Sequence, residues 1–326
     1  MCQPSLRTAR HRPGFTLIEL LVAMTIMIFL ATLAVLILPR MNEQQRAGKG
    51  ADQLQGWFLI AKQRALRSGL PSGLRLVDTN PTNNNGLIFE LQYVEQPPDY
   101  QVMVGGQPRR ISIKPNPKST ANPPTDFIAV LEPANPGAAD FSGGSGADKT
   151  LWPVQIGDYL EVQGGGLFHQ IIAYDPTGSG NDSTTLQLAP FATSLPVNPS
   201  GNIVEPTASY RVVRAPRVLV GEEPLKLPNN VAIFKGKCQL GTAVGGGGGT
   251  IDFMFAPSGR VLSPNVDPIY LWVGDATTID NPPYTDNQPV ILSIKASTGL
   301  ISLYPVDTTP SGDPYSLAKT NRSGGL

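Results

Sequence analysis

An apolar run near the N-terminus opens with Gly14-Phe15-Thr16-Leu17-Ile18-Glu19-Leu20-Leu21-Val22-Ala23-Met24 and continues to Leu38. From Phe15 to Leu38 the run contains a single charged residue, Glu19. A helix of that length rises about 36 Å, more than the ~30 Å hydrocarbon core of a bilayer. Arginines and no acidic residue precede the run, so we expect a cytoplasmic N-terminal tail and an exported C-terminal part. The sequence predicts a membrane-spanning helix over residues 15–38.

The small residue expected at a cleavage site lies before the apolar run. An ordinary secretory signal is cut after its apolar core. The sequence Arg12-Pro13-Gly14-Phe15-Thr16-Leu17-Ile18-Glu19 resembles the class III leader junction of type IV pilins and type II secretion pseudopilins. The resemblance implies that a prepilin peptidase removes residues 1–14 by cutting between Gly14 and Phe15. It also implies N-methylation of the new Phe15 amine, with the apolar helix retained.

Glu19 is the unusual residue of the run, because a carboxylate inside a bilayer span costs roughly 2.5–3.5 kcal/mol on insertion scales and is usually functional. The resemblance implies that Glu19 pairs with the Phe15 amine of a neighbouring subunit and sets the register of a filament. A simpler role stays open. Glu19 lies one turn from the processed N-terminus, where a carboxylate complements the helix dipole.

Composition limits the function classes for the rest of the chain. The 326 residues are 40% hydrophobic, 15% charged and carry no net charge, so one or two buried cores are possible and no nucleic-acid partner is expected. Glycine and proline make up about a fifth of the chain, which indicates many turns and therefore strands. Cys2 lies in the leader, so Cys238 is alone after processing and is expected to act as a small buried hydrophobe.

Residues 39–69 are expected to continue the first helix as an amphipathic segment. Leu54, Phe58, Ala61 and Ala65 recur at helical spacing. Two glycines, at 48 and 50, predict a weak point where the helix kinks or melts between Pro39 and Gly50.

Strand patterns occupy residues 70–94 and 210–304, for example the alternation over residues 87–94. These segments, with the helix of residues 54–69, resemble GspH/FimT-type minor pseudopilins. Residues 95–209 depart from that pattern and are expected to form a β-rich insertion, and residues 305–326 a C-terminal tail. The fold class predicted is α+β and pilin-like, with a long N-terminal helix packed on an antiparallel β-sheet.

Few residues offer material for catalysis or cofactor binding. The glycine-rich segment 143–150 has Asp148 where a phosphate-binding loop needs glycine. One histidine, His169, follows the leader, so histidine-based nucleophilic or zinc chemistry is not expected. Asp/Asn-rich loops at 175–182 and 275–287 lack a fixed ligand spacing and favour turns over calcium sites. The tail cations Lys319 and Arg322 are too few for a DNA-binding patch. We expect no cofactor, no metal and no enzymatic activity.

The resemblance implies a structural minor pseudopilin of a type II protein secretion system. Its expected location is the inner membrane, single-pass, with the C-terminal domain in the periplasm and then in the filament. The expected partners are prepilin peptidase, other pseudopilins or pilins, the inner-membrane assembly platform and membrane lipid. Two alternatives remain open: a minor type IV pilin for adhesion or DNA uptake, and an anchored binding module or enzyme housed in the insertion.

Overall fold

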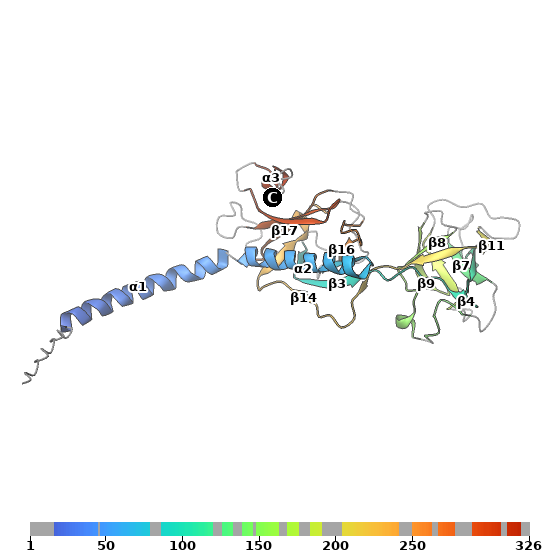
Figure 1. Cartoon of the computed structure of the whole chain (residues 1–326), viewed down its shortest axis with the longest axis horizontal. Coiled ribbons are helices and arrows are strands. Elements are labelled where there is room, and N and C mark those ends of the chain that lie inside the picture. The colour runs from blue at the N-terminus through green and yellow to red at the C-terminus, as the bar shows by residue number, and fades with distance from the viewer. Residues whose placement is uncertain are drawn as a thin grey trace, which may run out of the picture.

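The structure is a computed structural model of the chain. It describes residues 16–44, 46–78, 86–119, 126–132, 139–145, 148–162, 168–175, 183–190, 204–240, 250–262, 267–277, 289–307 and 312–320. They form an α+β protein with an N-terminal helix and antiparallel sheets, as predicted (Figure 1). The arrangement is consistent with the predicted pilin-like fold.

Two helices begin the described chain: α1, Leu17–Gln44, and α2, Arg46–Ser68. In Figure 1, α1 extends away from the sheets, whereas α2 lies across them. Within the described part of the chain, no helix combines the length and the apolar character needed to cross a membrane. The span over residues 15–38 therefore stays a prediction.

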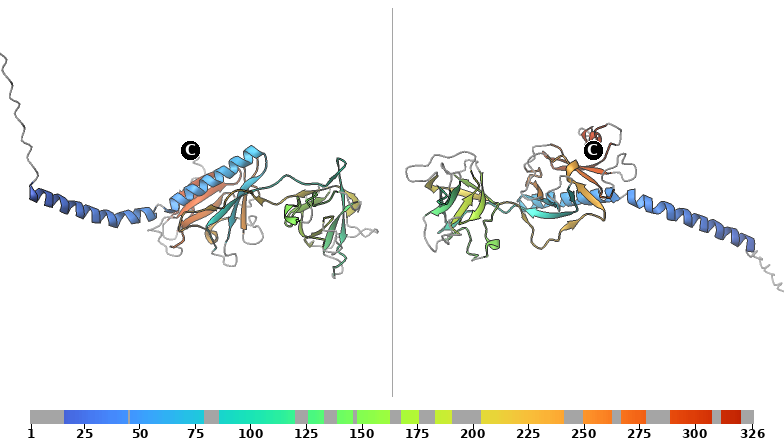
Figure 2. Two further views of the ribbon diagram at one scale, coloured as in Figure 1. Left: turned by 90° about the horizontal axis from the view of Figure 1, so that it is seen from below. Right: turned by 180° about the vertical axis from the view of Figure 1, so that it is seen from behind.

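Two five-stranded antiparallel sheets pack on α2 and form with it the helix–sheet domain (Figure 2). The first, ordered β13-β3-β1-β16 with β14 also pairing β3, contains β1 (Ser72–Val77), β3 (Glu90–Glu95), β13 (Arg217–Val218), β14 (Leu225–Lys226) and β16 (Thr250–Phe255). The second, ordered β19-β18-β17-β15-β2, contains β2 (Leu87–Ile88), β15 (Val231–Phe234), β17 (Ile269–Asp275), β18 (Val290–Lys295) and β19 (Leu300–Pro305). The short helices η2 (Lys235–Lys237) and α3 (Ser316–Thr320) complete this domain.

The buried face of α2 holds the core of the helix–sheet domain together. Leu54, Phe58, Ala61 and Ala65, which share the predicted helical spacing, are all fully buried. The Phe58 ring meets two β16 side chains, Phe253 and Phe255, edge to face, with centroids 5.6 and 6.4 Å apart. Such aromatic pairs add about 0.5–1.5 kcal/mol each beyond the burial of their area.

A second set of strands forms the insert domain, which has its own core. Its strands are β4 (Met103–Val104), β5 (Gln107–Pro108), β6 (Arg110–Pro115), β7 (Phe127–Glu132), β8 (Tyr159–Val162), β9 (Phe168–Tyr174), β10 (Thr185–Leu188), β11 (Val204–Ala208) and β12 (Tyr210–Val213), with the short helix η1 (Lys149–Leu151) between β7 and β8. The main sheet has the order β11-β6-β7-β10-β9-β8-β12. Its two end strands, β11 and β12, are separated along the chain by Ser209 alone.

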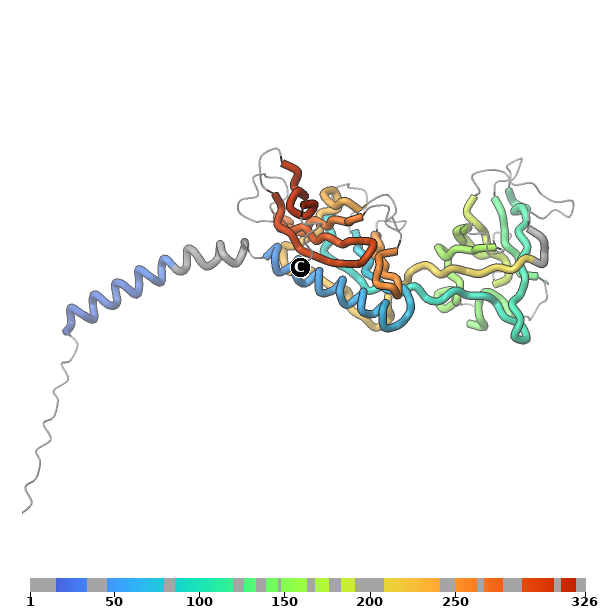
Figure 3. The backbone as a smooth tube through the Cα atoms, turned by 45° about the horizontal axis from the view of Figure 1, so that its top comes forward, coloured from blue at the N-terminus to red at the C-terminus, as the bar shows by residue number. Residues whose placement is uncertain are grey.

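Two segments connect the domains, and we call them the neck: residues 96–99 lead out and residues 213–216 lead back. They run side by side in Figure 3. On the helix–sheet side, β3 pairs with β13 through Glu95 and Arg217, and on the insert side Tyr100 forms a bridge with Val212. The second crossing thus lies a few residues after the boundary expected at residue 210, because β12 pairs with β8 of the insert domain.

The substitution Gly50→Ala should reveal how closely α2 approaches β15. A Cβ at Gly50 would lie 2.6 Å from Val231 Cγ1, whereas a Cβ at Gly48 would meet no atom within 4 Å. We expect Gly50→Ala to lower the free energy of unfolding by about 1–3 kcal/mol through overpacking. The matched control, Gly48→Ala, should raise it by up to ~1 kcal/mol, because alanine favours a helix over glycine. Denaturant unfolding in detergent measures both, and equal effects would contradict the close approach.

Candidate functional site

The N-terminal end of α1 carries the described part of the predicted leader junction. Thr16 precedes the helix, and the Glu19 amide donates hydrogen bonds to the Thr16 carbonyl at 3.1 Å and to its Oγ1 at 3.3 Å. This is an N-cap, and Glu19 occupies the acidic position of a capping box. Gly14 and Phe15 lie outside the described residues. Cleavage between them and methylation of Phe15 therefore stay predictions.

Glu19 is exposed and lies in the first turn of α1, where the helix dipole favours a negative charge. The cap fixes the start of the helix one residue after Thr16, which leaves Glu19 close to the expected processed terminus. This geometry fits both hypotheses for Glu19, the pairing with a neighbouring amine and the simple dipole role.

Large apolar side chains cover the first half of α1 on all sides. Their exposed fractions range from 41% to 83%, and they are Leu17, Ile18, Leu20, Leu21, Val22, Met24, Ile26, Met27, Ile28, Phe29, Leu30 and Leu33. A helix that is apolar all round is stable when lipid or other helices cover it. None of the described residues covers these side chains, so lipid or other subunits are the surroundings that this helix needs.

Residues 9–35 match the prokaryotic N-terminal methylation motif. The match supports the predicted class III leader of type IV pilin type, and with it a precursor of the pilin or pseudopilin type. Such a leader implies processing by a prepilin peptidase, membrane-anchored export and assembly with other pilins. No curated protein and no solved structure shows significant similarity to the chain. The GspH/FimT-type resemblance therefore stays a prediction.

Two other candidates from the sequence lie in the insert domain. His169 is a half-buried residue of β9, and burial lowers its pKa, so its imidazole is neutral at neutral pH. In the glycine-rich segment, Asp148 Oδ1 accepts hydrogen bonds from Thr150 Oγ1 at 2.6 Å and Thr150 N at 3.0 Å. These bonds hold the pKa of Asp148 below its usual range. The ionised carboxylate caps η1 and places a negative charge where a phosphate loop has none.

The acidic loops are only partly described. Asp275 Oδ1 accepts hydrogen bonds from Thr277 N at 2.8 Å and Thr277 Oγ1 at 2.6 Å, a turn held by its own side chains. Most of loops 175–182 and 275–287 lies outside the described residues. Among residues that the structure does place, no group of three or more His, Cys, Asp or Glu side chains could hold a metal ion. In the tail, Lys319 pairs with Asp313, and Arg322 lies outside the described residues.

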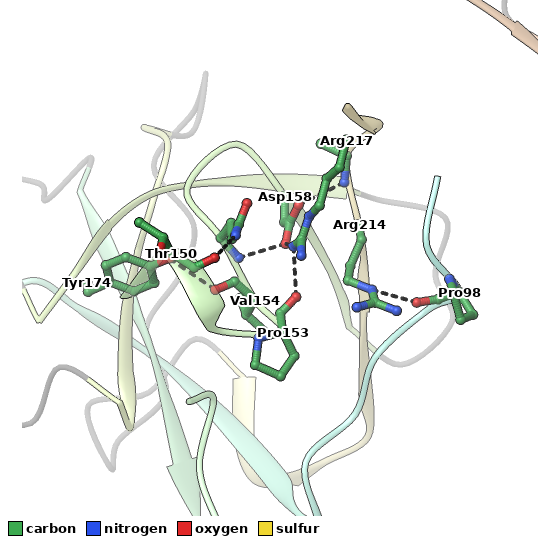
Figure 4. Close-up of polar contacts among 10 residues, drawn as sticks. Pro98, Thr150, Pro153, Val154, Asp158, Tyr174, Arg214 and Arg217 are labelled. Carbon is green, nitrogen blue, oxygen red and sulfur yellow. Dashed lines mark hydrogen bonds and ion pairs between the residues drawn. The ribbon is translucent and has the colours of Figure 1, made fainter. Parts of the chain in front are cut away.

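Functional candidates that sequence reasoning missed lie in the neck and next to it in both domains (Figure 4). Asp158, just before β8, is buried and forms an ion pair with Arg217 of β13. The neighbouring Arg214 donates to the Pro98 carbonyl. Two features of the sequence could have pointed to this region. Prolines are concentrated there, at 97, 98, 153 and 216, and three arginines follow one another at intervals of three residues, at 211, 214 and 217.

Cys238 is packed between the helix–sheet core and a second cluster built on Trp272 and Tyr270. Its Sγ accepts a hydrogen bond from Trp272 N at 3.4 Å and donates one to the Phe234 carbonyl at 3.1 Å. Burial raises the pKa of this thiol to about 12. Since the thiolate is the reactive form, the thiol is inert at neutral pH.

Alkylation measures the reactivity of the Cys238 thiol directly. In a chain with Cys2→Ser, we expect iodoacetamide at pH 8 to label native Cys238 about 100-fold or more slowly than the same chain in denaturant, because the thiolate fraction falls about tenfold for each unit of pKa. Labelling is followed by mass spectrometry. Equal rates in the native and denatured chain would show that the thiol is accessible.

Proposed function

We propose that the chain is a minor pseudopilin of a type II protein secretion system, a structural subunit and not an enzyme. In this proposal residues 15–38 anchor it in the inner membrane, and the helix–sheet and insert domains lie in the periplasm. The N-terminal methylation motif and the packing of α2 on antiparallel sheets support a pilin-type subunit. The position of the insert domain supports a minor role.

The insert domain leaves the helix–sheet domain at the C-terminal end of α2. The Gln96 amide donates to the Pro71 carbonyl at 2.8 Å, and Glu95 pairs with Ser72, just after α2 ends at Ser68. In Figure 1, α1 and the insert domain lie at opposite ends of the molecule. In a filament whose helices run along its axis, a subunit stacked above this one would meet the insert domain. The observation favours a place at the tip of the pseudopilus and a low copy number.

The number of copies of this chain in each filament, and its position along the filament, test the proposal that it lies at the tip. We expect quantitative mass spectrometry of sheared filaments to give a ratio to the main subunit far below one. Gold-labelled antibody against the insert domain should then decorate filament ends. Labelling along the whole filament would contradict the proposal.

The substitution Glu19→Val tests the role of the carboxylate in assembly. We expect membrane insertion to be unchanged, because the substitution removes the one charge of the apolar run. Incorporation into filaments should fall roughly tenfold or more, since a hydrogen bond to a charged group contributes about 1.5–3 kcal/mol. Glu19→Asp, which keeps the charge, is the control and should retain part of the incorporation. Normal incorporation of Glu19→Val would leave only the dipole role.

Purification of a C-terminally tagged chain from native membranes tests the choice of system. Mass spectrometry should find a methylated Phe15 terminus and secretion-system pseudopilins as partners. The same terminus with type IV pilus subunits would instead identify a minor pilin. An intact Met1 terminus without either set of partners would contradict both hypotheses, the pseudopilin and the minor pilin.

A further inference from the structure

The two strands of the neck keep one register from the helix–sheet domain to the insert domain. Glu95 is opposite Arg217 at one end, and Tyr100 is opposite Val212 at the other. Four residues separate these pairs in each strand, 96–99 and 213–216. The two segments of the neck therefore have the same length, and neither contains extra residues that would form a loop. Two independent linkers would not need to match in this way.

Prolines interrupt the backbone ladder inside the neck, because Pro97, Pro98 and Pro216 have no N–H to donate. Arginine side chains supply hydrogen bonds to the carbonyl groups there. Arg214 Nε donates to the Pro98 carbonyl at 2.7 Å, and Arg75 Nη2 of β1 donates to the Pro216 carbonyl at 3.1 Å. The first bond ties the two arms to each other, and the second ties the returning arm to the helix–sheet domain.

Asp158 ties the returning arm to the insert domain. Its side chain is almost completely buried, and its Oδ1 accepts a hydrogen bond from Ala215 N at 2.8 Å. Its Oδ2 accepts from Gln155 N at 2.8 Å and from Arg217 Nη2 at 3.1 Å. Arg217 Nη2 also donates to the Pro153 carbonyl at 2.8 Å, so it contacts the insert domain at two points. Figure 4 shows these contacts converging on one place.

We infer that the neck is a rigid coupling that holds the insert domain in one orientation relative to α2, and that the Asp158–Arg217 pair is its latch. Arg217 belongs to β13 of the helix–sheet domain, whereas Asp158 belongs to the insert domain. Their contact therefore joins the two domains through side chains, in addition to the two segments of the neck. The insert domain then presents the same surface in the same direction on every copy.

The charges around the latch make it sensitive to the loss of Asp158. Burial, and then the neighbouring Arg217 cation, lower the pKa of the Arg214 guanidinium. Arg217 Nε is itself buried and has no hydrogen-bond partner among the described residues. The two guanidinium groups influence each other, and the Asp158 carboxylate offsets both, with a smaller contribution from Asp99 at Arg214. Removal of Asp158 would leave the Arg217 guanidinium without its ion-pair partner and the Ala215 amide without its acceptor.

Double electron–electron resonance on the full chain in detergent tests the coupling. Spin labels are placed on introduced cysteines at the exposed residues Gln63 of α2 and Gln170 of β9, in a chain with Cys2→Ser. The inert Cys238 thiol is retained. We expect a single narrow distance distribution for the parent chain and at least a twofold broader one for Asp158→Asn. Arg217→Gln, which removes the other partner, should broaden it similarly.

The control is Glu222→Gln, which removes an ion pair with Arg64 inside the helix–sheet domain and leaves the Asp158–Arg217 pair unchanged. It should leave the distribution as narrow as in the parent chain. Circular dichroism of each variant establishes that both domains are folded. A broad distribution in the parent chain would overturn the inference, and so would folded Asp158→Asn and Arg217→Gln chains that keep the parental width.

Discussion

The close approach of α2 to the two sheets is the constraint on which the helix–sheet domain depends. One face of the helix is built from small residues, including Gly50, Ala51, Ala61 and Ala65, and all are buried. A larger side chain at these places would push the helix outward and expose the core beneath Phe58. Polar side chains at the edges of the same helix complete the contact. Lys62 Nζ donates to the carbonyls of the β18–β19 turn, at 2.9 Å for Gly299 and 3.1 Å for Thr298.

The strand pattern of the sequence predicts burial well and strand partners poorly. Residues 87–94 alternate as one strand would, yet the structure divides them into β2, which pairs with β15, and β3, which pairs with β1. The chain passes from one sheet to the other at Phe89. Alternation reports which side chains are buried and carries no information on the neighbouring strand. The strand β6, whose Ile111 and Ile113 alternate with polar residues, was not predicted, although it pairs with β7, the next strand of its sheet along the chain, as well as with the distant β11.

The candidate functional residues also divide into those that depend on near neighbours in sequence and those that depend on distant ones. The leader junction and the apolar run depend on residues a few positions apart, so they can be predicted from the sequence alone. The neck depends on contacts across the fold, since Asp158 meets Ala215 and Arg217, 57 and 59 residues later. No short pattern contains these partners. An aspartate before a strand is common, and only its burial next to Arg217 distinguishes Asp158.

The pairing of β3 with β13 has a consequence for the history of the chain. These strands are antiparallel neighbours in one sheet, and the whole insert domain lies between Glu95 and Arg217. Without that domain, a tight turn would join them into an ordinary β-hairpin. The ends of the insert domain are likewise as close together as two paired strands, at Tyr100 and Val212. A module with adjacent ends can be inserted at a hairpin turn without displacing either strand, and the insert domain meets this geometric condition.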